Sequence, residues 1–400
     1  MDPNRVGRAG CLPPTQDETA RDWVASRVRD KALRVMIAGG GTGGHVMPAL
    51  AIARALRDRY GAEVCLVGTA RGLETRLAPE AGFRLELVRS GQWKNVSLGT
   101  RLRTMMDLPL GVLRCVALLR EFQPQVVVGV GGYASGPAMI AALLLRTPTL
   151  AYEPNAVPGL TNRWLGRHVN AAAVNFAQTA PYFRGAEVTG VPVRPEIFAA
   201  APPAEAVAEH RAPRLLVTAG SNGALVFNQT MPLIVKQLME EVPGLTIVHQ
   251  AGARQLESTR AAYAATGADA ARWVVEAFLT DMPQQYAAAD LVLSRAGSTV
   301  AELCAAAKPS LLVPLATAAD DHQRRNAEAM VAAGAAEMLL QKDATAETLR
   351  GALLELLRDE PRRRAMAERA RALAKPGALD RIAEMVLRLA GRTAGMSILP

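Results

Sequence analysis

The chain has 400 residues and half of them are hydrophobic, which is enough to bury two ordinary domain cores and excludes an intrinsically disordered protein. Its net charge of +9 favours anionic partners such as nucleotides, lipid diphosphates or an anionic membrane face, although a generic basic surface explains the charge equally well. Aromatic residues make up only 4% of the chain and no compact Lys/Arg tract occurs, so nucleic acid is a poor candidate partner.

The cysteines and the N-terminal segment bear on the compartment. The four cysteines lie far apart in the sequence and form no metal-binding or redox spacing, which favours a reducing cytoplasm. Residues 1–32 mix charged residues and proline without the apolar centre of a secretion signal. No later segment approaches the ~20 uninterrupted apolar residues of a membrane span. We therefore expect a soluble or peripheral protein in which residues 1–32 form a flexible extension.

Residues 33–192 alternate short apolar runs with longer amphipathic stretches. The apolar runs predict buried strands at Leu33–Ala38, Val64–Val67, Val126–Val130, Thr149–Tyr152 and Ala171–Val174. Strands that alternate with helices over this length predict a doubly wound parallel sheet. A Pro-rich stretch, residues 193–213, then indicates a linker between two domains.

A glycine run follows the first predicted strand directly and precedes a helical pattern. It reads Gly39-Gly40-Gly41-Thr42-Gly43-Gly44-His45. Glycines leave no Cβ in the way, so N–H groups and the positive end of the helix can meet a phosphate closely. The spacing also fits a dinucleotide fingerprint, but the next strand ends at Gly68 and Thr69 with no acid before Glu74 to bind a ribose. The run therefore favours a diphosphate-handling α/β protein over a nicotinamide enzyme.

Residues 214–376 repeat this architecture. A strand that begins at Arg214 enters a small-residue turn, Gly220–Ala224, and further strands are predicted at Thr246–Gln250, Trp273–Val275, Leu291–Ser294 and Ser310–Val313. Two such domains that face each other place a ligand cleft between them, at the carboxyl ends of both sheets. The last segment, residues 377–400, contains a helical stretch that we expect to pack back on the first domain.

Two polar clusters in the second half are candidate binding sites. Gly297–Thr299 open a helix with N–H groups and hydroxyls that suit a diphosphate, and Glu302 lies one turn further on, where it can bridge two ribose hydroxyls. Simple helix capping explains the same residues. His322 and Gln323 stand at the presumed edge of the cleft, where an amide can hold sugar hydroxyls; a solvated helix start is the alternative.

Several motifs occur in order between about Leu33 and Ala390. Besides the run Gly39–His45 they are Gly131–Pro137, Glu153–Asn155, Gly159–Asn162, Gly190–Arg194, Gly220–Ala224, Asn228–Gln229 and Arg295–Glu302. Together they closely resemble the MurG family. The resemblance implies an α/β GT-B fold, which has two Rossmann-like parallel-sheet domains with an interdomain cleft. It also implies inverting transfer of N-acetylglucosamine from UDP-N-acetylglucosamine to undecaprenyl-diphospho-N-acetylmuramoyl-pentapeptide, by a peripheral enzyme on the cytoplasmic face of the bacterial inner membrane.

The resemblance also implies which residues bind the donor. Glu302 would contact the uridine ribose, and Phe278 and Leu279 would flank the uracil. The diphosphate and the transferred sugar would meet residues from four further loops. These residues are Arg194, Ser221, Asn222, Gly223, Gly297, Ser298, Thr299, His322 and Gln323.

For the acceptor, the resemblance implies a diphosphate site formed by two loops, with Asn155 pointing into the cleft. The loop residues are Gly41, Thr42, Gly43, Gly44, Tyr133 and Ser135. The family often shows His-Glu-Gln-Asn at 152–155 and Gly-Gly-Ser-Gln-Gly at 219–223, and this chain departs from both patterns. The departures weaken the side-chain assignments at positions 152, 154 and 222 and leave the class unaffected.

Inverting transfer requires a base for the acceptor hydroxyl and a stabiliser for the leaving diphosphate. His45 is the preferred base, because positioned proton transfer typically contributes ~10²–10⁴-fold; the alternative is a histidine that only binds the acceptor phosphate. Glu153 is the second candidate, and it can equally orient Asn155 or His45. N–H groups at helix starts would stabilise the leaving group. We predict no cofactor and no metal, because no acids with metal-binding spacing lie near these loops and Asp320–Asp321 suit loop solvation or a helix cap.

The segment Leu98–Leu110 interleaves Leu and Met with Arg101 and Arg103, a composition suited to an anionic lipid surface. A helix buried in the first domain explains the pattern equally well. Two other functions stay open. One is a different two-domain glycosyltransferase, for example one that glycosylates a diacylglycerol, and the other is a UDP-sugar binder or epimerase on the same fold. The loops Gly39–His45 and Gly131–Pro137 favour a diphosphate-bearing acceptor over both.

Overall fold

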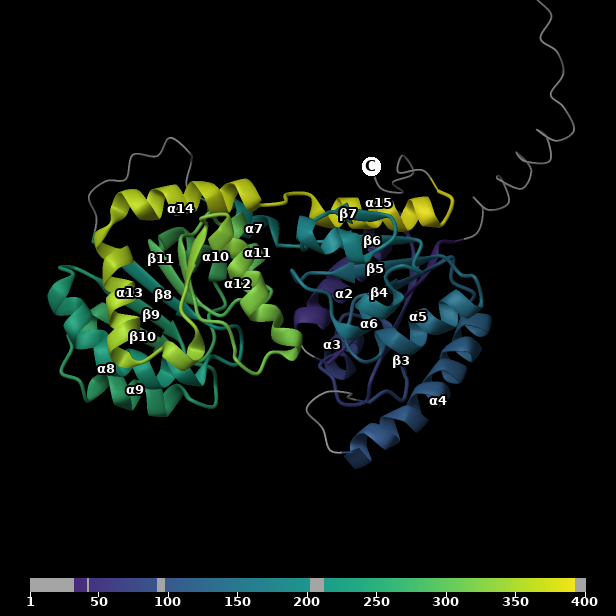
Figure 1. Cartoon of the computed structure of the whole chain (residues 1–400), viewed down its shortest axis with the longest axis horizontal. Coiled ribbons are helices and arrows are strands. Elements are labelled where there is room, and N and C mark those ends of the chain that lie inside the picture. The colour runs from purple at the N-terminus through teal and green to yellow at the C-terminus, as the bar shows by residue number, and fades with distance from the viewer. Residues whose placement is uncertain (1–31, 42, 92–97, 202–211, 393–400) are drawn as a thin grey trace, which may run out of the picture.

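The computed structural model describes residues 32–41, 43–91, 98–201 and 212–392. These residues form two parallel sheets with helices on both faces, and the two units lie side by side along the long axis of the molecule (Figure 1). This arrangement confirms the predicted pair of Rossmann-like parallel-sheet domains. None of the described helices is both long and apolar enough to cross a membrane.

The first sheet has seven strands in the order β3-β2-β1-β4-β5-β6-β7, and all neighbouring strands are parallel. The strands are β1 (Arg34–Ala38), β2 (Glu63–Gly68), β3 (Arg84–Leu87), β4 (Val126–Gly129), β5 (Thr149–Glu153), β6 (Ala171–Val174) and β7 (Ala186–Val188). The helices of this half are α2 (Gly43–Tyr60), α3 (Glu74–Glu80), α4 (Leu98–Phe122), α5 (Ser135–Leu144), α6 (Leu160–Leu165) and the 3₁₀ turn η1 (Ala177–Tyr182).

The second sheet has six parallel strands in the order β10-β9-β8-β11-β12-β13. The strands are β8 (Arg214–Thr218), β9 (Thr246–Gln250), β10 (Trp273–Glu276), β11 (Leu291–Ser294), β12 (Ser310–Leu312) and β13 (Ala336–Met338). The α-helices are α7 (Pro195–Ala199), α8 (Leu225–Glu241), α9 (Leu256–Ala264), α10 (Met282–Ala288), α11 (Thr299–Ala305), α12 (His322–Ala332), α13 (Ala346–Arg358), α14 (Glu360–Leu373) and α15 (Ala378–Leu389). Three 3₁₀ turns join them, η2 (Ala270–Arg272), η3 (Ala319–Asp321) and η4 (Gln341–Asp343).

Each sheet has a core on both faces, because its central strands are apolar along their whole length. In β1 the side chains of Val35 and Ile37 enter one core and those of Met36 and Ala38 enter the other, as the alternation of side chains along a strand requires. Parallel strands that are covered on both faces are expected to be apolar runs of this kind. The central strands were therefore the easiest elements to predict from the sequence.

Two segments connect the halves. The stretch predicted as a linker contains α7, whose Ile197 is buried in a core of the second half. After α14 the chain returns to the first half, where α15 lies against α2 (Figure 1). The apolar side of α15, with Ile382 and Val386, is buried in the same core as β1, and Arg381 donates to the carbonyl of Thr189 at 2.7 Å.

Candidate active site

Ligands of doubly wound sheets bind at the carboxyl ends of the strands, where the strand order reverses. In the first sheet this point lies between β1 and β4, which are followed by Gly39–His45 and Gly131–Pro137. In the second sheet it lies between β8 and β11, which are followed by Gly220–Ala224 and Arg295–Glu302. The topology thus brings four of the glycine-containing motifs of the sequence to the two positions where a ligand is expected.

Both backbone groups of Gly41 tie the first loop to the turn between β2 and α3. The N–H of Gly41 donates to Oε2 of Glu74 at 2.8 Å, and its carbonyl accepts from the N–H of Leu73 at 3.2 Å. Gly41 has a φ of +94°, a conformation that favours glycine. The amide that we expected to face an acceptor diphosphate is therefore committed to the Glu74 carboxylate.

The other predicted acceptor residues are placed unevenly. Gly43 and Gly44 form the first turn of α2 and are partly exposed, and Tyr133 is exposed on the second loop. Ser135, by contrast, is fully buried at the start of α5. Its buried hydroxyl has no hydrogen-bond partner among the described residues, and its role toward the acceptor stays a prediction. Thr42 lies outside the described residues.

The second loop of the first half packs directly on the first. A Cβ at Gly132 would lie 2.3 Å from the carbonyl oxygen of Gly40, and a Cβ at Gly131 would lie 2.8 Å from Cδ2 of His45. Both glycines have positive φ, +76° for Gly132 and +89° for Gly131. Glycine at these two positions therefore lets the backbones touch and lets the imidazole of His45 rest on the second loop.

His45 is neutral at physiological pH. Its pKa is lowered from 6.5 to about 4, mainly by burial and also by the positive charge that His322 can carry, while the carboxylate of Glu74 acts in the opposite direction. A neutral imidazole has a lone pair that can accept a proton. Because His322 begins α12, a group of the second half acts electrostatically on His45 of the first half.

Glu153 ends β5 and is buried with both carboxylate oxygens fully engaged. Oε1 accepts from the backbone and side-chain amides of Asn155, and Oε2 accepts from the N–H of Gly159 and the side chain of Asn162, all at 3.0 Å. Burial raises the pKa of Glu153, while these hydrogen bonds work in the opposite direction. The contacts fit a carboxylate that orients Asn155, the alternative left open by the sequence, better than they fit a base.

Asn155 is connected to the second half by a hydrogen bond from Asn326, a buried residue on α12. Asn326 Nδ2 donates to Oδ1 of Asn155 at 3.1 Å and to the carbonyl of Ala296 at 3.0 Å. Its Oδ1 accepts from the N–H of Ala156 at 2.8 Å. One asparagine therefore joins the loop after β5 to the loop after β11, and the Asn155 amide lies at the junction of the two halves.

The turn after β8 is shaped by close backbone contact with the end of β9. Gly223 has a φ of +67°, and a Cβ there would lie 2.0 Å from the carbonyl oxygen of Ala251. Ser221 and Asn222 form the exposed tip of this turn. The predicted donor residues of this turn are therefore presented on a backbone that only glycine allows.

Gln250, the buried last residue of β9, braces the same turn from behind. Its Nε2 donates to the carbonyl of Gly220 at 2.6 Å, and its Oε1 accepts from the N–H of Leu279 at 3.0 Å. One neutral side chain thus links the turn predicted to bind the diphosphate to the loop predicted to flank the uracil. Within that loop Leu279 is buried and Phe278 is exposed.

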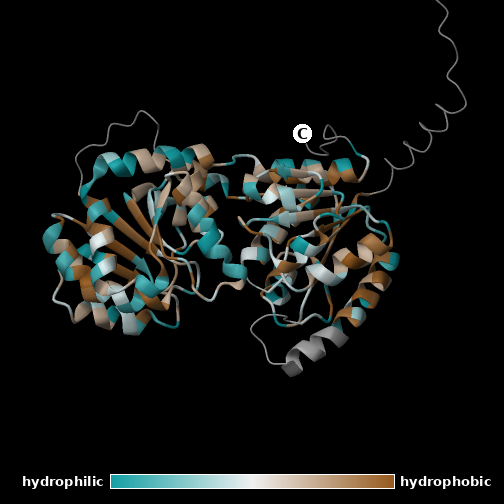
Figure 2. Cartoon of the chain, viewed as in Figure 1, coloured by the Kyte–Doolittle hydropathy of each residue, from teal (hydrophilic) through white to brown (hydrophobic). Residues whose placement is uncertain are grey.

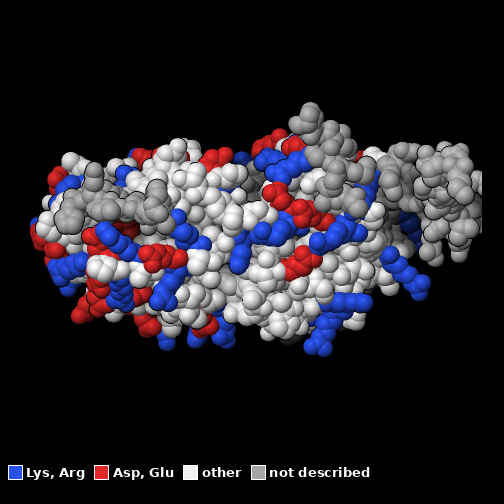
Figure 3. Space-filling view, turned by 90° about the horizontal axis from the view of Figure 1, so that it is seen from above, with Lys and Arg blue, Asp and Glu red and all other residues white. Residues whose placement is uncertain are grey.

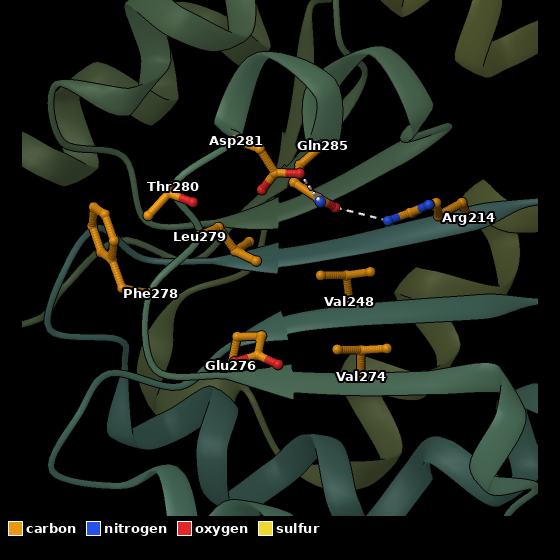
Figure 4. Close-up of a pocket in the computed structure, with 9 residues that line it drawn as sticks. All are labelled: Arg214, Val248, Val274, Glu276, Phe278, Leu279, Thr280, Asp281 and Gln285. Atoms are coloured by element: carbon orange, nitrogen blue, oxygen red, sulfur yellow. Dashed lines mark hydrogen bonds between the residues drawn. The ribbon is translucent and has the colours of Figure 1, made fainter.

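A cavity of about 400 Å³ extends from this loop along the face of the second sheet (Figure 4). Arg214 donates to Gln285, which donates in turn to Asp281, and this chain of hydrogen bonds forms one wall. The cavity is lined by Arg214, Val248, Val274, Glu276, Phe278, Leu279, Thr280, Asp281 and Gln285. It therefore includes both residues that the sequence assigned to the uracil.

Glu302 on α11 is held by a residue that the sequence did not single out. The hydroxyl of Tyr286, fully buried on α10, donates to Oε2 of Glu302 at 2.9 Å. Burial raises the pKa of Glu302, while Tyr286 and the nearby charge of Arg194 act in the opposite direction. Arg194 is exposed just before α7, so the structure brings a cation and a braced carboxylate together at the predicted donor site.

The starts of α11 and α12 carry the remaining predicted donor residues. Ser298 is exposed, and Gly297 and Thr299 are partly exposed. Gln323 accepts a backbone N–H of the preceding loop through Oε1 at 3.0 Å, and its Nε2 lies within van der Waals reach of a Cβ built at Gly297. His322 contacts a backbone carbonyl through Nδ1 at 2.6 Å. The two helix starts are therefore neighbours, as a shared donor site requires.

Comparison with known proteins identifies the family. Residues 35–174 match the glycosyltransferase family 28 N-terminal domain, and residues 214–382 match the glycosyltransferase family 28 C-terminal domain. A UDP-N-acetylglucosamine--N-acetylmuramyl-(pentapeptide) pyrophosphoryl-undecaprenol N-acetylglucosamine transferase from Anaeromyxobacter sp. (strain Fw109-5) is 41% identical over 91% of this chain and 95% of its own length. The transferase of that name from Xanthomonas campestris pv. campestris (strain 8004) is 42% identical over 89% of this chain and 82% of its own.

The crystal structure of MurG from Acinetobacter baumannii superposes with a TM-score of 0.76 at 33% identity, and the match covers 89% of this chain and 99% of that one. The chain belongs to the MurG family. Membership of the MurG family makes it a glycosyltransferase with the GT-B fold, as the sequence predicted. A UDP-N-acetylglucosamine 2-epimerase also superposes, with a TM-score of 0.62, but at 15% identity this likeness shows the fold alone.

Four buried side chains of this MurG-family site were not predicted as functional residues: Glu74, Gln250, Tyr286 and Asn326. The sequence carried a signal for one of them, because Gln250 is a polar residue at the end of an apolar strand. Glu74 attracted notice only as the first acid after β2. The helical positions of Tyr286 and Asn326 gave no signal that sequence reasoning can use.

Proposed function

We propose that the chain transfers N-acetylglucosamine from UDP-N-acetylglucosamine to undecaprenyl-diphospho-N-acetylmuramoyl-pentapeptide, with inversion at the anomeric carbon. This reaction converts lipid I to lipid II in peptidoglycan synthesis. The observation that carries the proposal is the 41% identity, over 91% of the chain, to a transferase whose name states this donor and this acceptor. The site adds a neutral imidazole on one half and a braced, part-buried carboxylate on the other.

On the acceptor side, His45 acts as the general base. Its lone pair takes the proton of the acceptor hydroxyl while that oxygen bonds to the anomeric carbon from the face opposite UDP. The bond from the anomeric carbon to the UDP oxygen breaks, and UDP leaves with the electron pair. The low pKa of His45 keeps it unprotonated before the reaction, and the anionic diphosphate of a bound acceptor raises that pKa toward the range in which proton transfer is efficient.

Around the acceptor, Gly43 and Gly44 at the start of α2 and Tyr133 on the second loop face the diphosphate. The positive end of α2 favours an anion there. Glu153 acts indirectly, because its carboxylate holds Asn155 at the junction of the halves.

On the donor side, Glu302 binds the ribose hydroxyls and Tyr286 keeps its carboxylate in place. The exposed N–H groups and hydroxyls at the starts of α8 and α11 stabilise the charge that develops on the leaving diphosphate. Phe278 and Leu279 flank the uracil, and His322 and Gln323 contact the hydroxyls of the transferred sugar. The diphosphate is contacted by Arg194, Ser221, Asn222, Gly223, Gly297, Ser298 and Thr299.

We assign the membrane-facing surface to α4 and α5 of an enzyme that works as a peripheral protein on the cytoplasmic face of the inner membrane. Leu110 and Leu113 on α4 are 48% and 65% exposed, and Leu144 at the end of α5 is 67% exposed. Figure 2 shows that the described part of α4 is mostly hydrophobic. Exposed leucines on neighbouring helices suit the interface of a bilayer. Of the predicted segment Leu98–Leu110, the side chains before residue 107 lie outside the described residues.

The opposite side of the molecule is less suited to lipid. The face over α14 and α15 shows acidic and basic side chains interspersed (Figure 3). On α15, Asp380 forms an ion pair with Arg59 and Arg388 forms one with Glu187.

The membrane-facing surface is tested by replacing Leu113 and Leu144 by Ser, which should reduce co-sedimentation with anionic vesicles. Leu233→Ser is the matched control, at a leucine on α8 that is 70% exposed, and it should leave co-sedimentation unchanged. Equal loss in both variants would contradict the placement.

The proposal is tested by UDP release from UDP-N-acetylglucosamine, measured with and without a short-chain muramoyl-pentapeptide lipid diphosphate. The wild-type chain should release UDP only when both substrates are present, and His45→Ala and Glu302→Ala should abolish most of that release. Binding of UDP-N-acetylglucosamine without any acceptor-dependent release would contradict the proposed acceptor.

A further inference from the structure

We propose that Glu74 is the positioning residue of the first glycine loop, and that its carboxylate fixes Gly41 and thereby the start of α2 and the place of His45. This inference rests on the proposed function, in which His45 is the base. Glu74 touches neither substrate in this account. It acts through the backbone of the loop that carries the base.

Both carboxylate oxygens of Glu74 have defined donors. Oε2 accepts from the N–H of Gly41 at 2.8 Å, while Oε1 accepts from the N–H of Thr69 at 2.9 Å and from its hydroxyl at 3.1 Å. The side chain is only 3% exposed. A buried carboxylate whose two oxygens are bound from two different segments fixes those segments relative to each other, because breaking either contact leaves a buried group unsatisfied.

The space around this carboxylate is formed by three glycines from three chain segments. A Cβ at Gly40 would lie 2.0 Å from an atom of the Glu74 side chain, one at Gly68 would lie 2.4 Å away, and one at Gly72 would lie 1.9 Å away. These separations are far below van der Waals contact. The loop after β1, the end of β2 and the turn before α3 thus all lack side chains where Glu74 stands, which is the pattern of a site built to hold this carboxylate.

The charge of Glu74 also acts on the proposed base. Transfer turns His45 into an imidazolium, and a carboxylate nearby stabilises that product, in opposition to burial and to His322. Two of the groups whose charges bear on His45 are His322 from α12 and Glu74 from α3. The same carboxylate therefore holds the base in position and also stabilises its protonated form.

A residue that only stabilised the fold would affect both substrates when it is removed. Within the described part of the chain, Glu74 accepts its hydrogen bonds from the first half, whereas the donor residues Glu302 and Gln250 belong to the second. Glu74 should therefore influence the acceptor and the chemical step while leaving donor affinity intact. This split separates positioning from a general structural role.

The test compares Glu74→Gln with Glu80→Gln, an exposed glutamate at the other end of α3. Glutamine has one acceptor oxygen, so either Gly41 or Thr69 faces an amide NH₂ that cannot accept its N–H. In Glu74→Gln, kcat/KM for the acceptor should fall by about 10²-fold, since a misplacement of the order of 1 Å has that effect. The Kd for UDP-N-acetylglucosamine should stay at the wild-type value, and Glu80→Gln should match wild type in both.

A second variant and a second measurement keep the inference testable if Glu74→Gln folds poorly. Gly72→Ala displaces Glu74 without changing the glycine loop itself and should give the same split. Hydrogen exchange of the amide of Gly41 should be slow in wild type and Glu80→Gln and much faster in Glu74→Gln and Gly72→Ala, whether or not any acceptor is turned over.

The outcomes are distinct. Wild-type acceptor turnover in Glu74→Gln, equal exchange at Gly41, or a matching loss of donor affinity would each overturn the role of Glu74. If the wild-type chain itself transferred nothing to the lipid diphosphate, the proposed function would fail. The exchange measurement would then still decide whether Glu74 holds the loop.

Discussion

In the first half, the glycine turn after the leading strand is held by a buried carboxylate, whereas in the second half the corresponding turn is held by a buried amide. Glu74 accepts the N–H of Gly41 and leaves a negative charge behind the loop. Gln250 adds no charge, and its hydrogen bond to that turn goes to the carbonyl of Gly220 and not to an N–H group. In the proposed function, the same strand–glycine–helix design presents a base in one half and binds a diphosphate in the other.

The largest effects should come from filling the two glycine loops. Gly223→Ala forces a Cβ to within 2.0 Å of a carbonyl oxygen, so we expect the Kd of UDP-N-acetylglucosamine to rise by about 10²-fold. Gly131→Ala presses on His45 and should lower kcat by a similar factor with donor Kd unchanged. Calorimetric titration measures the donor Kd of both variants, and steady-state kinetics measure their kcat. If both variants weakened donor binding, the division between the halves would be wrong.

A charge behind the donor turn should have the next largest effect. Gln250→Glu places a carboxylate next to Gly220 and behind the turn proposed to bind the diphosphate, and like charges repel. We expect donor affinity to fall about 30-fold in Gln250→Glu and about 5-fold in the uncharged Gln250→Leu, which loses only the hydrogen bonds. Donor titration of both variants is the measurement. Equal losses would show that the charge of the brace does not matter.

The link between the halves should contribute less. Asn326→Ala removes three hydrogen bonds at the junction, and we expect the free energy of unfolding to fall by about 2 kcal/mol. Arg163→Ala removes the ion pair between Arg163 and Asp320 at the same junction. This should lower the free energy of unfolding by under ~1 kcal/mol. Denaturant unfolding of the two variants provides the comparison, and a larger loss in Arg163→Ala would contradict the part given to Asn326.

The last effect is small at neutral pH and grows only in acid, and it concerns the buried histidine of the second half. Burial lowers the pKa of His249 from 6.5 to about 3, so between those values the unfolded chain binds a proton that the folded chain does not. This contribution to stability is complete above pH 6.5 and is lost as the pH falls toward 3. In His249→Phe, the slope of the free energy of unfolding against pH should therefore be smaller by about 1.4 kcal/mol per pH unit in this acid range.

His249→Phe should also lose some stability at neutral pH, because Tyr263 no longer has the hydrogen bond to Nδ1. Chemical unfolding at several pH values measures both effects. An unchanged acid slope would mean that His249 is not buried in its neutral form.

The fold was predictable where the sequence carries a strong physical signal. The central strands are apolar on both faces and run into glycine turns, so their positions followed from hydrophobicity alone. The sequence reasoning missed β3, β7 and β13, which are short strands at the edges of the sheets. Their residues are only partly buried, so they lack the apolar run that marks a central strand.

The loops of the candidate site could be predicted from the sequence, but the buried residues that hold those loops could not. Glycine runs and Glu302 stand out because they follow strands. Their braces lie elsewhere in the chain: Glu74 is 33 residues from Gly41, and Asn326 is 171 residues from Asn155. Such pairs meet only through the tertiary fold. The burial of Ser135 and the occupied oxygens of Glu153 also depend on that packing, which explains why composition and spacing could not foresee them.

The most direct test of this division of labour is to measure donor binding and sugar transfer on one preparation of His45→Ala. The Kd of UDP-N-acetylglucosamine is determined first, and the lipid diphosphate acceptor is then added in a single-turnover experiment with saturating donor. If His45 is the base and binds no part of the donor, the variant has a wild-type donor Kd and a transfer rate reduced by ~10²–10⁴-fold. Transfer at the wild-type rate, or loss of donor binding, would contradict it.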